Sequence, residues 1–194
     1  MGRVRSIGAT IAAALAVVAI AGCGTEVDPP PAPPAASQPT MSETAMPERD
    51  ETGMAEQPAV PERLRFTGTT LDGTQFTGES LAGKAAVLWF WAPWCPKCAA
   101  EAPTVAEAAR DTAGRVSFVG IAAQDEVPAM RDFVGRHGVG DFPHVADEEG
   151  AIWQRFGVTY QPAYAFVRPD GTVDVVKQQL SARELTERVN DLAG

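Results

Sequence analysis

The sequence predicts an α/β fold with a mixed central sheet flanked by helices. Residues 85–91 form an unbroken apolar run, which is typical of a strand buried on both faces of a covered sheet. From that strand onward, strand and helix patterns alternate along the chain. A hairpin pattern around residues 168–171 precedes a last helix, so the sheet should contain antiparallel as well as parallel strands.

Each expected element rests on a local signal. The turn residues 71–73 lie between residues 64–66 and 74–76, which predicts an N-terminal β-hairpin. The Ala- and Glu-rich segment from Cys95 to about Thr112 predicts a helix with a kink at Pro103. The remaining expected elements are strands at 116–122, 144–146, 164–167 and 172–177, and helices at 129–136, 150–156 and after a capping box at Ser181 and Glu184.

Composition and charge exclude some classes of function. The chain of 194 residues is 45% apolar and 21% charged, as in an ordinary globular protein. Sixteen Lys and Arg stand against 25 Asp and Glu, and this net charge of −9 argues against nucleic acid as a partner, because phosphate binding needs clustered cations. The composition divides the chain into segments 1–22, 23–61 and 62–194, and we expect the last to be one folded domain.

Residues 1–22 have the pattern of an export signal. Arg3 and Arg5 precede an uncharged, largely apolar stretch that is shorter than the roughly 20 apolar residues of a spanning helix. The segment 20–23 resembles a bacterial lipobox, which implies cleavage before Cys23 and a lipid anchor on its thiol. The protein would then sit on the outer face of the cell membrane. The alternative is a plain secretory signal that leaves Cys23 unmodified.

Residues 24–61 have the composition of a tether. They hold nine of the sixteen prolines, seven acids against the single base Arg49, and no aromatic residue. Such a segment cannot bury enough apolar surface to offset its ordering entropy, so a disordered, semi-extended tether is expected over 23–61. Its three scattered methionines are assigned no metal, because metal sites need convergent ligands.

The chemistry is carried by residues 94–98, with the sequence WCPKC. Cys95 follows a buried strand and opens a helix, where unpaired N–H groups and the helix dipole favour a thiolate. Pro96 suits the first helical position because its φ is already helical. Cys98 lies one turn further on, where its sulfur can attack a mixed disulfide formed at Cys95.

Other interpretations of the two cysteines are weaker. A zinc site needs about four ligands, and His137 and His144 are too far apart in sequence to form the usual close pair. Covalent c-type haem needs a histidine directly after the second cysteine, where this chain has Ala99. A purely structural disulfide would close a loop too small to restrain the unfolded chain much. Redox catalysis is therefore favoured, with no metal and no cofactor.

A family resemblance follows from three segments. Residues 89–98 resemble the active-site strand and loop of thioredoxin-fold proteins, and residues 98–103 are similar to the extracytoplasmic TlpA/ResA/DsbE branch. Residues 158–163 occupy the place of the family's cis-proline loop. The resemblance spans about residues 64–193, and the whole pattern looks most like actinobacterial DsbE/DsbF-type secreted proteins. It implies a thioredoxin-like fold and a client groove, whose residues would be Trp94, Pro96, Gln161 and Pro162.

One departure from the family concerns the proton acceptor. Cytoplasmic thioredoxins carry a buried Asp six residues before the first cysteine, and this chain has Trp89 there. Glu101 lies three residues after Cys98 on the same helix face, so we expect it to replace the missing acid. The alternative is a solvated helix glutamate. Trp91 and Trp94 are expected to frame the active site, Trp153 to lie in the core, and His137 and His144 to lie at the surface or in turns.

Together these patterns predict an extracytoplasmic thiol–disulfide oxidoreductase that acts on exported proteins, in oxidative folding. Cys95 is the expected nucleophile and Cys98 the resolving thiol. A membrane redox partner is expected to renew the pair, and the protein is expected to be a monomer. The alternatives are a reductase, for instance in cytochrome c maturation, a peroxidase, or a non-catalytic binding lipoprotein. The peroxidatic pattern is absent, because Pro103-Thr104 follows the cysteine pair instead of preceding it.

Overall fold

The computed structural model describes residues 60–194. The predicted export signal, the lipidation site Cys23 and nearly all of the predicted tether lie outside the described residues. In the part that is described, no helix is long and apolar enough to cross a membrane.

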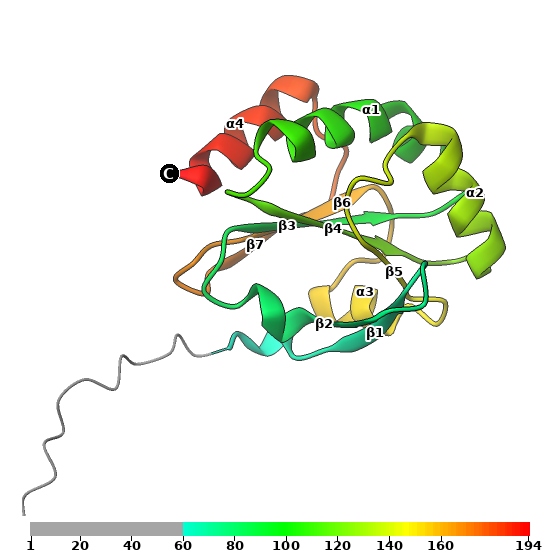
Figure 1. The fold of residues 1–194 in the computed structure, drawn as a ribbon, viewed down its shortest axis with the longest axis horizontal. Helices are drawn as coiled ribbons and strands as arrows, with labels where there is room; N and C mark the ends of the chain where they lie inside the picture. Colours follow the sequence, from blue (N-terminus) through cyan, green and yellow to red (C-terminus); the bar gives the residue numbers. More distant parts are fainter. Residues whose placement is uncertain (1–59) are drawn as a thin grey trace, which may run out of the picture. The chain divides into compact units, whose positions relative to one another are not determined.

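The fold is built on one mixed sheet of seven strands in the order β2-β1-β5-β4-β3-β6-β7 (Figure 1). β3 pairs in parallel with β4, and β4 in parallel with β5, while β6 runs antiparallel to β3 on its other side. Antiparallel hairpins close both edges of the sheet. The strands are β1 (Thr67–Thr70), β2 (Gln75–Thr77), β3 (Ala86–Trp91), β4 (Ser117–Ala122), β5 (His144–Ala146), β6 (Ala163–Val167) and β7 (Val173–Val176).

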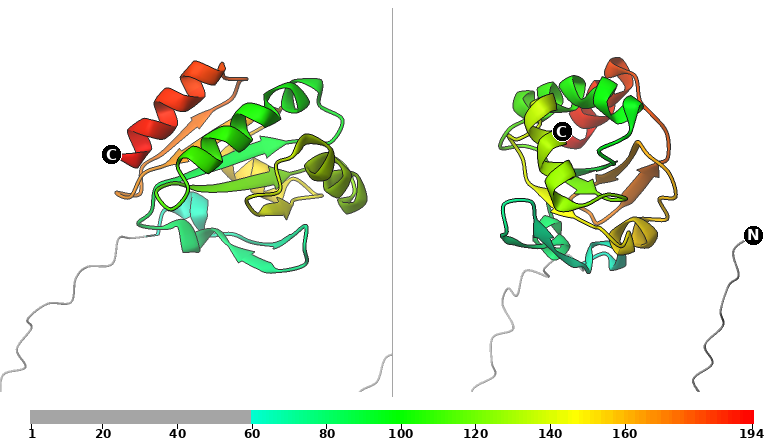
Figure 2. Two further views of the ribbon diagram at one scale, coloured as in Figure 1. Left: turned by 45° about the horizontal axis from the view of Figure 1, so that its top comes forward. Right: turned by 90° about the vertical axis from the view of Figure 1, so that its right-hand side faces the viewer.

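Helices cover both faces of the sheet, as Figures 1 and 2 show. α1, α2 and α4 lie on one face, with α1 in contact with both of the others, and α3 lies on the opposite face. The helices are α1 (Pro96–Asp111), α2 (Val127–His137), α3 (Ala151–Phe156) and α4 (Ala182–Ala193). Two short 3-10 helices, η1 (Glu62–Leu64) and η2 (Gly78–Leu81), flank the N-terminal hairpin.

The central strand β3 explains why the apolar run predicts a covered sheet. All six of its residues are buried. Its alternating side chains enter two separate cores, since successive residues of a strand face opposite sides of the sheet. Val87, Trp89 and Trp91 pack beneath α1 and α2, and Ala86, Leu88 and Phe90 pack toward α3. This is a thioredoxin-like α/β fold, as the sequence predicts.

Two local expectations need correction. Residues 62–64 form the 3-10 helix η1, so the first strand of the hairpin begins at Thr67 and not near Leu64. α2 begins at Val127, two residues earlier than expected, because Pro128 fits the first turn of a helix, where its missing N–H has no partner to lose. The helix ends at His137, and the C-cap residue Gly138 has a φ of 66°, the left-handed conformation that glycine tolerates best.

Candidate active site

Cys95 and Cys98 form a disulfide at the N-terminus of α1, with their Cα atoms 5.3 Å apart. Cys95 is the N-cap residue of this helix, and its sulfur accepts a hydrogen bond from the Cys98 backbone N–H at 3.1 Å. Pro96 occupies the first turn. Once the disulfide is reduced, the same N–H and the helix dipole stabilise negative charge on Cys95 Sγ, which lowers the free energy of the thiolate.

The residue before the disulfide presents a large aromatic face to solvent. Trp94 is 56% exposed, although its indole N–H donates to the backbone oxygen of Gln124 at 3.1 Å. Gln124 follows β4 and has a φ of 64°, which is unusual for a residue other than glycine. Trp94 is thus anchored at one edge while its ring stays free beside Cys95.

The Gln161–Pro162 loop reaches the same end of the sheet as the disulfide. The peptide bond between these residues is cis, as the resemblance implies. Ala163, the next residue, pairs with Phe90 near the end of β3, and β3 leads directly into the Cys95 turn. Gln161 is half-buried and Pro162 is buried. The end of the sheet at which α1 begins therefore holds all four predicted groove residues, which are Trp94, Pro96, Gln161 and Pro162.

Glu101 lies in α1, three residues after Cys98, and is buried rather than extended into solvent. Its side chain is only 5% exposed, and its Oε1 accepts a hydrogen bond from the Trp89 indole N–H at 2.7 Å. Burial raises the pKa of Glu101 to about 7, because a low-dielectric environment disfavours the charged carboxylate, while the bond from Trp89 opposes this shift. The tryptophan at the position of the family's buried Asp is thus a hydrogen-bond donor to a carboxyl from the helix.

Two expectations about aromatic and histidine residues are wrong. His144 is buried in β5 and is not a surface residue: its Nδ1 lies 3.2 Å from the Trp91 indole nitrogen and its Nε2 lies 2.7 Å from the Val139 oxygen. Trp91 is fully buried and stacks on Phe133 at 4.4 Å, so it lies in the core and does not frame the surface of the site. His137 ends α2, half-buried against Phe133, and Trp153 lies in the core as expected.

Tyr164 is a residue of the site that was not predicted from the sequence. It lies in β6 directly opposite Trp89, is fully buried, and lowers the pKa of Glu101 in opposition to the effect of burial. A tyrosine inside an otherwise apolar strand indicates a polar contact in the core, because buried tyrosines usually have a polar partner. The identity of the partner depends on strand register and helix packing, which local patterns do not contain.

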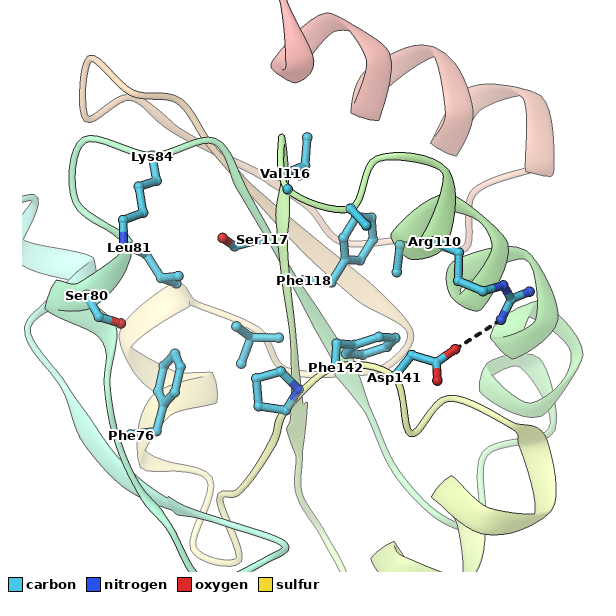
Figure 3. Close-up of a pocket in the computed structure, with 15 residues that line it drawn as sticks. Phe76, Ser80, Leu81, Lys84, Arg110, Val116, Ser117, Phe118, Asp141 and Phe142 are labelled. Carbon is cyan, nitrogen blue, oxygen red and sulfur yellow. Dashed lines mark hydrogen bonds and ion pairs between the residues drawn. The ribbon is translucent and has the colours of Figure 1, made fainter.

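A separate hollow of about 470 Å³, which neither Cys95 nor Cys98 lines, is drawn in Figure 3. Phe76, Phe118 and Phe142 line it, and Arg110 and Asp141 form an ion pair at its rim with 3.4 Å between Nη1 and Oδ2. Its lining comes from β2, η2, the C-terminal part of α1, the start of β4 and the segment before β5, and no lining residue carries sulfur. The thiol chemistry therefore belongs to the surface around Cys95. Among residues 60–194, no group of three or more His, Cys, Asp or Glu side chains is arranged to hold a metal ion.

The fold and the disulfide at the helix N-terminus define a thiol–disulfide oxidoreductase with a thioredoxin fold. Residues 47–193 match the Redoxin family, and the chain belongs to that family. Its relatives include proteins named thiol-disulfide oxidoreductase ResA, such as that of Oceanobacillus iheyensis, which is 25% identical over 68% of this chain and 69% of the relative. The chain is thus a thiol–disulfide oxidoreductase of the DsbE/ResA type.

Mycobacterial proteins are among its relatives. The "soluble secreted antigen MPT53" of Mycobacterium tuberculosis is 47% identical over 71% of this chain and 82% of the relative. A solved structure described as "MTB dsbF in its mixed oxidized and reduced forms" is 56% identical, has a TM-score of 0.67, and covers 69% of this chain and 98% of that chain. A secreted Mycobacterium tuberculosis disulfide oxidoreductase, described as homologous to E. coli DsbE, is 48% identical with a TM-score of 0.65, over 68% and 98% of the two chains.

Proposed function

We propose that the protein is an exported, lipid-anchored oxidoreductase that introduces disulfides into other exported proteins. The observation that carries the proposal is the Cys95–Cys98 pair at the N-terminus of α1, where the Cys98 N–H donates to Cys95 Sγ. Relatives described as secreted support a location outside the cytoplasm, where disulfides persist. The lipobox-like segment before Cys23 supports an anchor on the outer face of the cell membrane.

The proposed reaction exchanges one disulfide for another. A client thiolate attacks Cys95 Sγ, the bond to Cys98 breaks, and the Cys98 thiolate leaves and takes a proton from Glu101. A second client thiolate then attacks the client sulfur of the mixed disulfide, and Cys95 leaves as a thiolate. The client loses two electrons and the cysteine pair gains them. A membrane redox partner that accepts two electrons restores the Cys95–Cys98 disulfide.

Stabilisation of the reduced pair supports the oxidising direction. A cysteine with a low pKa leaves a mixed disulfide readily as its thiolate. A stabilised reduced form also makes the disulfide of a cysteine pair a stronger oxidant. The N-cap contact at Cys95 acts in that sense. Trp94, Pro96, Gln161 and Pro162 are proposed to line the groove that holds an extended client beside Cys95.

The reductive direction is the second candidate, and Glu101 is the observation that favours it. When a client disulfide is reduced, Cys98 must lose a proton before it attacks, and a nearby carboxyl with a pKa of about 7 can accept that proton. The reduction potential of the Cys95–Cys98 pair, measured against glutathione, separates the two candidates. A value of about −120 mV indicates an oxidant, and a value of about −270 mV indicates a reductant.

The roles of the two cysteines are tested by trapping. Cys98→Ser should accumulate mixed disulfides, formed when the Cys95 thiolate attacks a disulfide of an exported protein, because the Cys98 thiol that would attack Cys95 Sγ is missing. Cys95→Ser serves as the matched control and should trap none and catalyse neither refolding of reduced ribonuclease nor insulin reduction. The trapped complexes are separated without reductant and measured by mass spectrometry. Equal trapping by Cys98→Ser and the wild type would contradict the role assignment.

A further inference from the structure

We infer that Tyr164 is a positioning residue for the proton step, with its hydroxyl paired to Glu101 Oε2 in both protonation states of the carboxyl. This inference rests on the proposed role of Glu101 as the group that exchanges a proton with Cys98. Two buried side-chain oxygens have no hydrogen-bond partner in the described residues, and they are Glu101 Oε2 and the Tyr164 hydroxyl. A buried polar atom without a partner destabilises the folded state, so two of them near each other call for an explanation.

Strand register brings these two side chains together. Tyr164 of β6 lies directly opposite Trp89 of β3, and side chains at opposite positions project from the same face with their Cβ atoms about 4.5–5.5 Å apart. Trp89 already contacts Glu101 Oε1. Tyr164 therefore lies on the same face of the sheet as Trp89. Its hydroxyl lowers the pKa of Glu101, and the carboxyl of Glu101 raises the pKa of Tyr164.

The two neighbours of Glu101 differ in what they can do. The Trp89 indole has an N–H and no acceptor, so Oε1 must accept and any proton on the carboxyl belongs on Oε2. A tyrosine hydroxyl both donates and accepts. It can therefore donate to Oε2 when Glu101 is ionised and accept from Oε2 when Glu101 is protonated. Glu101 can then change its charge without leaving a buried polar atom unpaired in either state.

Tyr164 itself keeps its proton throughout. Burial raises the pKa of Tyr164 well above its ordinary value, and the nearby carboxyl raises it further. The hydroxyl is therefore a permanent donor and acceptor and does not act as the acid or base. A bond to the ionised carboxylate is charge-assisted and stronger than one to the neutral acid, so Tyr164 should lower the pKa of Glu101.

The other titratable groups on the elements around the carboxyl do not set its charge. The causes that determine the pKa of Glu101 are its burial, Trp89 and Tyr164, and no charged side chain of the described residues is among them. On α1 these groups include Cys98, which is held in the disulfide, and the exposed Lys97 and Glu107. On α4 they include Arg188, which lies over Phe166 and pairs with Asp174. On α2 they include Arg131, Asp132 and His137, and His144 lies behind Trp91.

The test is the pKa of Glu101 in the full chain, followed by the NMR shift of its side-chain carboxyl carbon in the oxidised protein, where neither cysteine titrates. Tyr164→Phe removes the hydroxyl and keeps the ring, and we expect the pKa of Glu101 to rise by roughly one pH unit or more. The chain has two tyrosines, so Tyr160→Phe is a matched control. The Tyr160 hydroxyl bonds to the Lys177 oxygen, and its loss should leave the pKa of Glu101 unchanged.

The outcomes separate this inference from the proposed function. An unchanged or lowered pKa of Glu101 in Tyr164→Phe, or an equal rise in Tyr160→Phe, would overturn the inference and would leave the proposed function standing. Failure of the wild type to exchange disulfides would overturn the proposed function, yet the carboxyl titration would remain readable. If Tyr164→Phe does not fold, the inference is tested in the wild type by the infrared C=O stretch of protonated Glu101. This band is identified by its loss in Glu101→Gln. A hydrogen-bonded frequency supports the inference, and that of a free carboxyl overturns it.

Discussion

Glu101 combines two properties that oppose each other: it is a carboxyl suited to proton exchange near neutral pH, and its charge is expensive to bury. Its pKa is raised to about 7 in the folded protein by burial, from an ordinary value of 4.5. A group with a raised pKa binds more protons in the folded state than in the unfolded state between those two values. The stability that Glu101 contributes is therefore fully present below pH 4.5 and is lost as the pH rises through 7.

Glu101→Gln should remove this pH dependence. Near pH 4 the variant and the wild type both bury a neutral group, so their free energies of unfolding should be similar. Between about pH 4.5 and pH 8 the variant should become more stable than the oxidised wild type, by on the order of 3 kcal/mol. The measurement is urea unfolding at a series of pH values. Glu107→Gln, at an exposed glutamate of the same helix, is the control, and a parallel pH trend in the two variants would contradict the prediction.

His144 shows the opposite sign. Burial lowers its pKa to about 4, so the folded protein keeps its ring neutral and holds it between Trp91 and the Val139 oxygen. Its contribution to stability is present above the ordinary value of 6.5 and is lost as the pH falls toward 4. Burial of these two residues thus lowers the free energy of unfolding at opposite ends of the pH range: Glu101 at high pH and His144 at low pH.

At the scale of elements, strand β4 packs closely against the buried side chains of His144 and Trp91. Gly120 of β4 faces β5 and pairs with His144, and a Cβ at this position would overlap the imidazole ring and lie 2.8 Å from Trp91 Nε1. A glycine is required here by the close approach of the neighbouring side chains, and not by its backbone angles. This contact fixes the spacing between the strand and the aromatic residues under α1.

Gly120→Ala should therefore destabilise the protein by about 1–3 kcal/mol, since the surrounding core must shift to admit a methyl group. Gly135→Ala is the matched control, because a Cβ added to Gly135 in α2 would meet no atom within 4 Å, and alanine favours a helix by about 0.5–1 kcal/mol. Thermal unfolding should move in opposite directions for the two variants. A neutral Gly120→Ala would show that β4 and β5 separate more easily than this packing indicates.

At the scale of the whole molecule, the predicted anchor and the catalytic domain should act independently. Cys23→Ala in the full chain should move the protein from the membrane to the soluble extracytoplasmic fraction without changing its rate of disulfide exchange, because the predicted tether separates the two. Cys95→Ser is the reciprocal control, which should remain at the membrane and lose activity. Fractionation and mass spectrometry of the mature N-terminus provide the measurement. A mature wild type that begins elsewhere, or lacks acyl chains at Cys23, would contradict the lipoprotein prediction.

Features that depend on neighbours along the chain can be predicted without the structure. Strand β3, the position of Cys95 at the start of α1, the capping box at Ser181 and the order of the elements all follow from local periodicity and end signals. The hairpin start and the first turn of α2 differ from expectation by a few residues, because the ends of elements depend on contacts beyond the local pattern.

The surroundings of the carboxyl depend instead on how the elements pack. The sequence places Glu101 one turn after Cys98, but its burial and its contact with Trp89, twelve residues earlier in the chain, depend on how α1 lies against β3. Tyr164 reaches the same carboxyl through the pairing of β3 with β6. His144 was expected at the surface for the same reason: its partners lie on other parts of the fold. Local patterns predict the positions of Cys95 and Cys98 at the start of α1, whereas the pKa of Glu101 is set by its burial and by side chains distant in sequence.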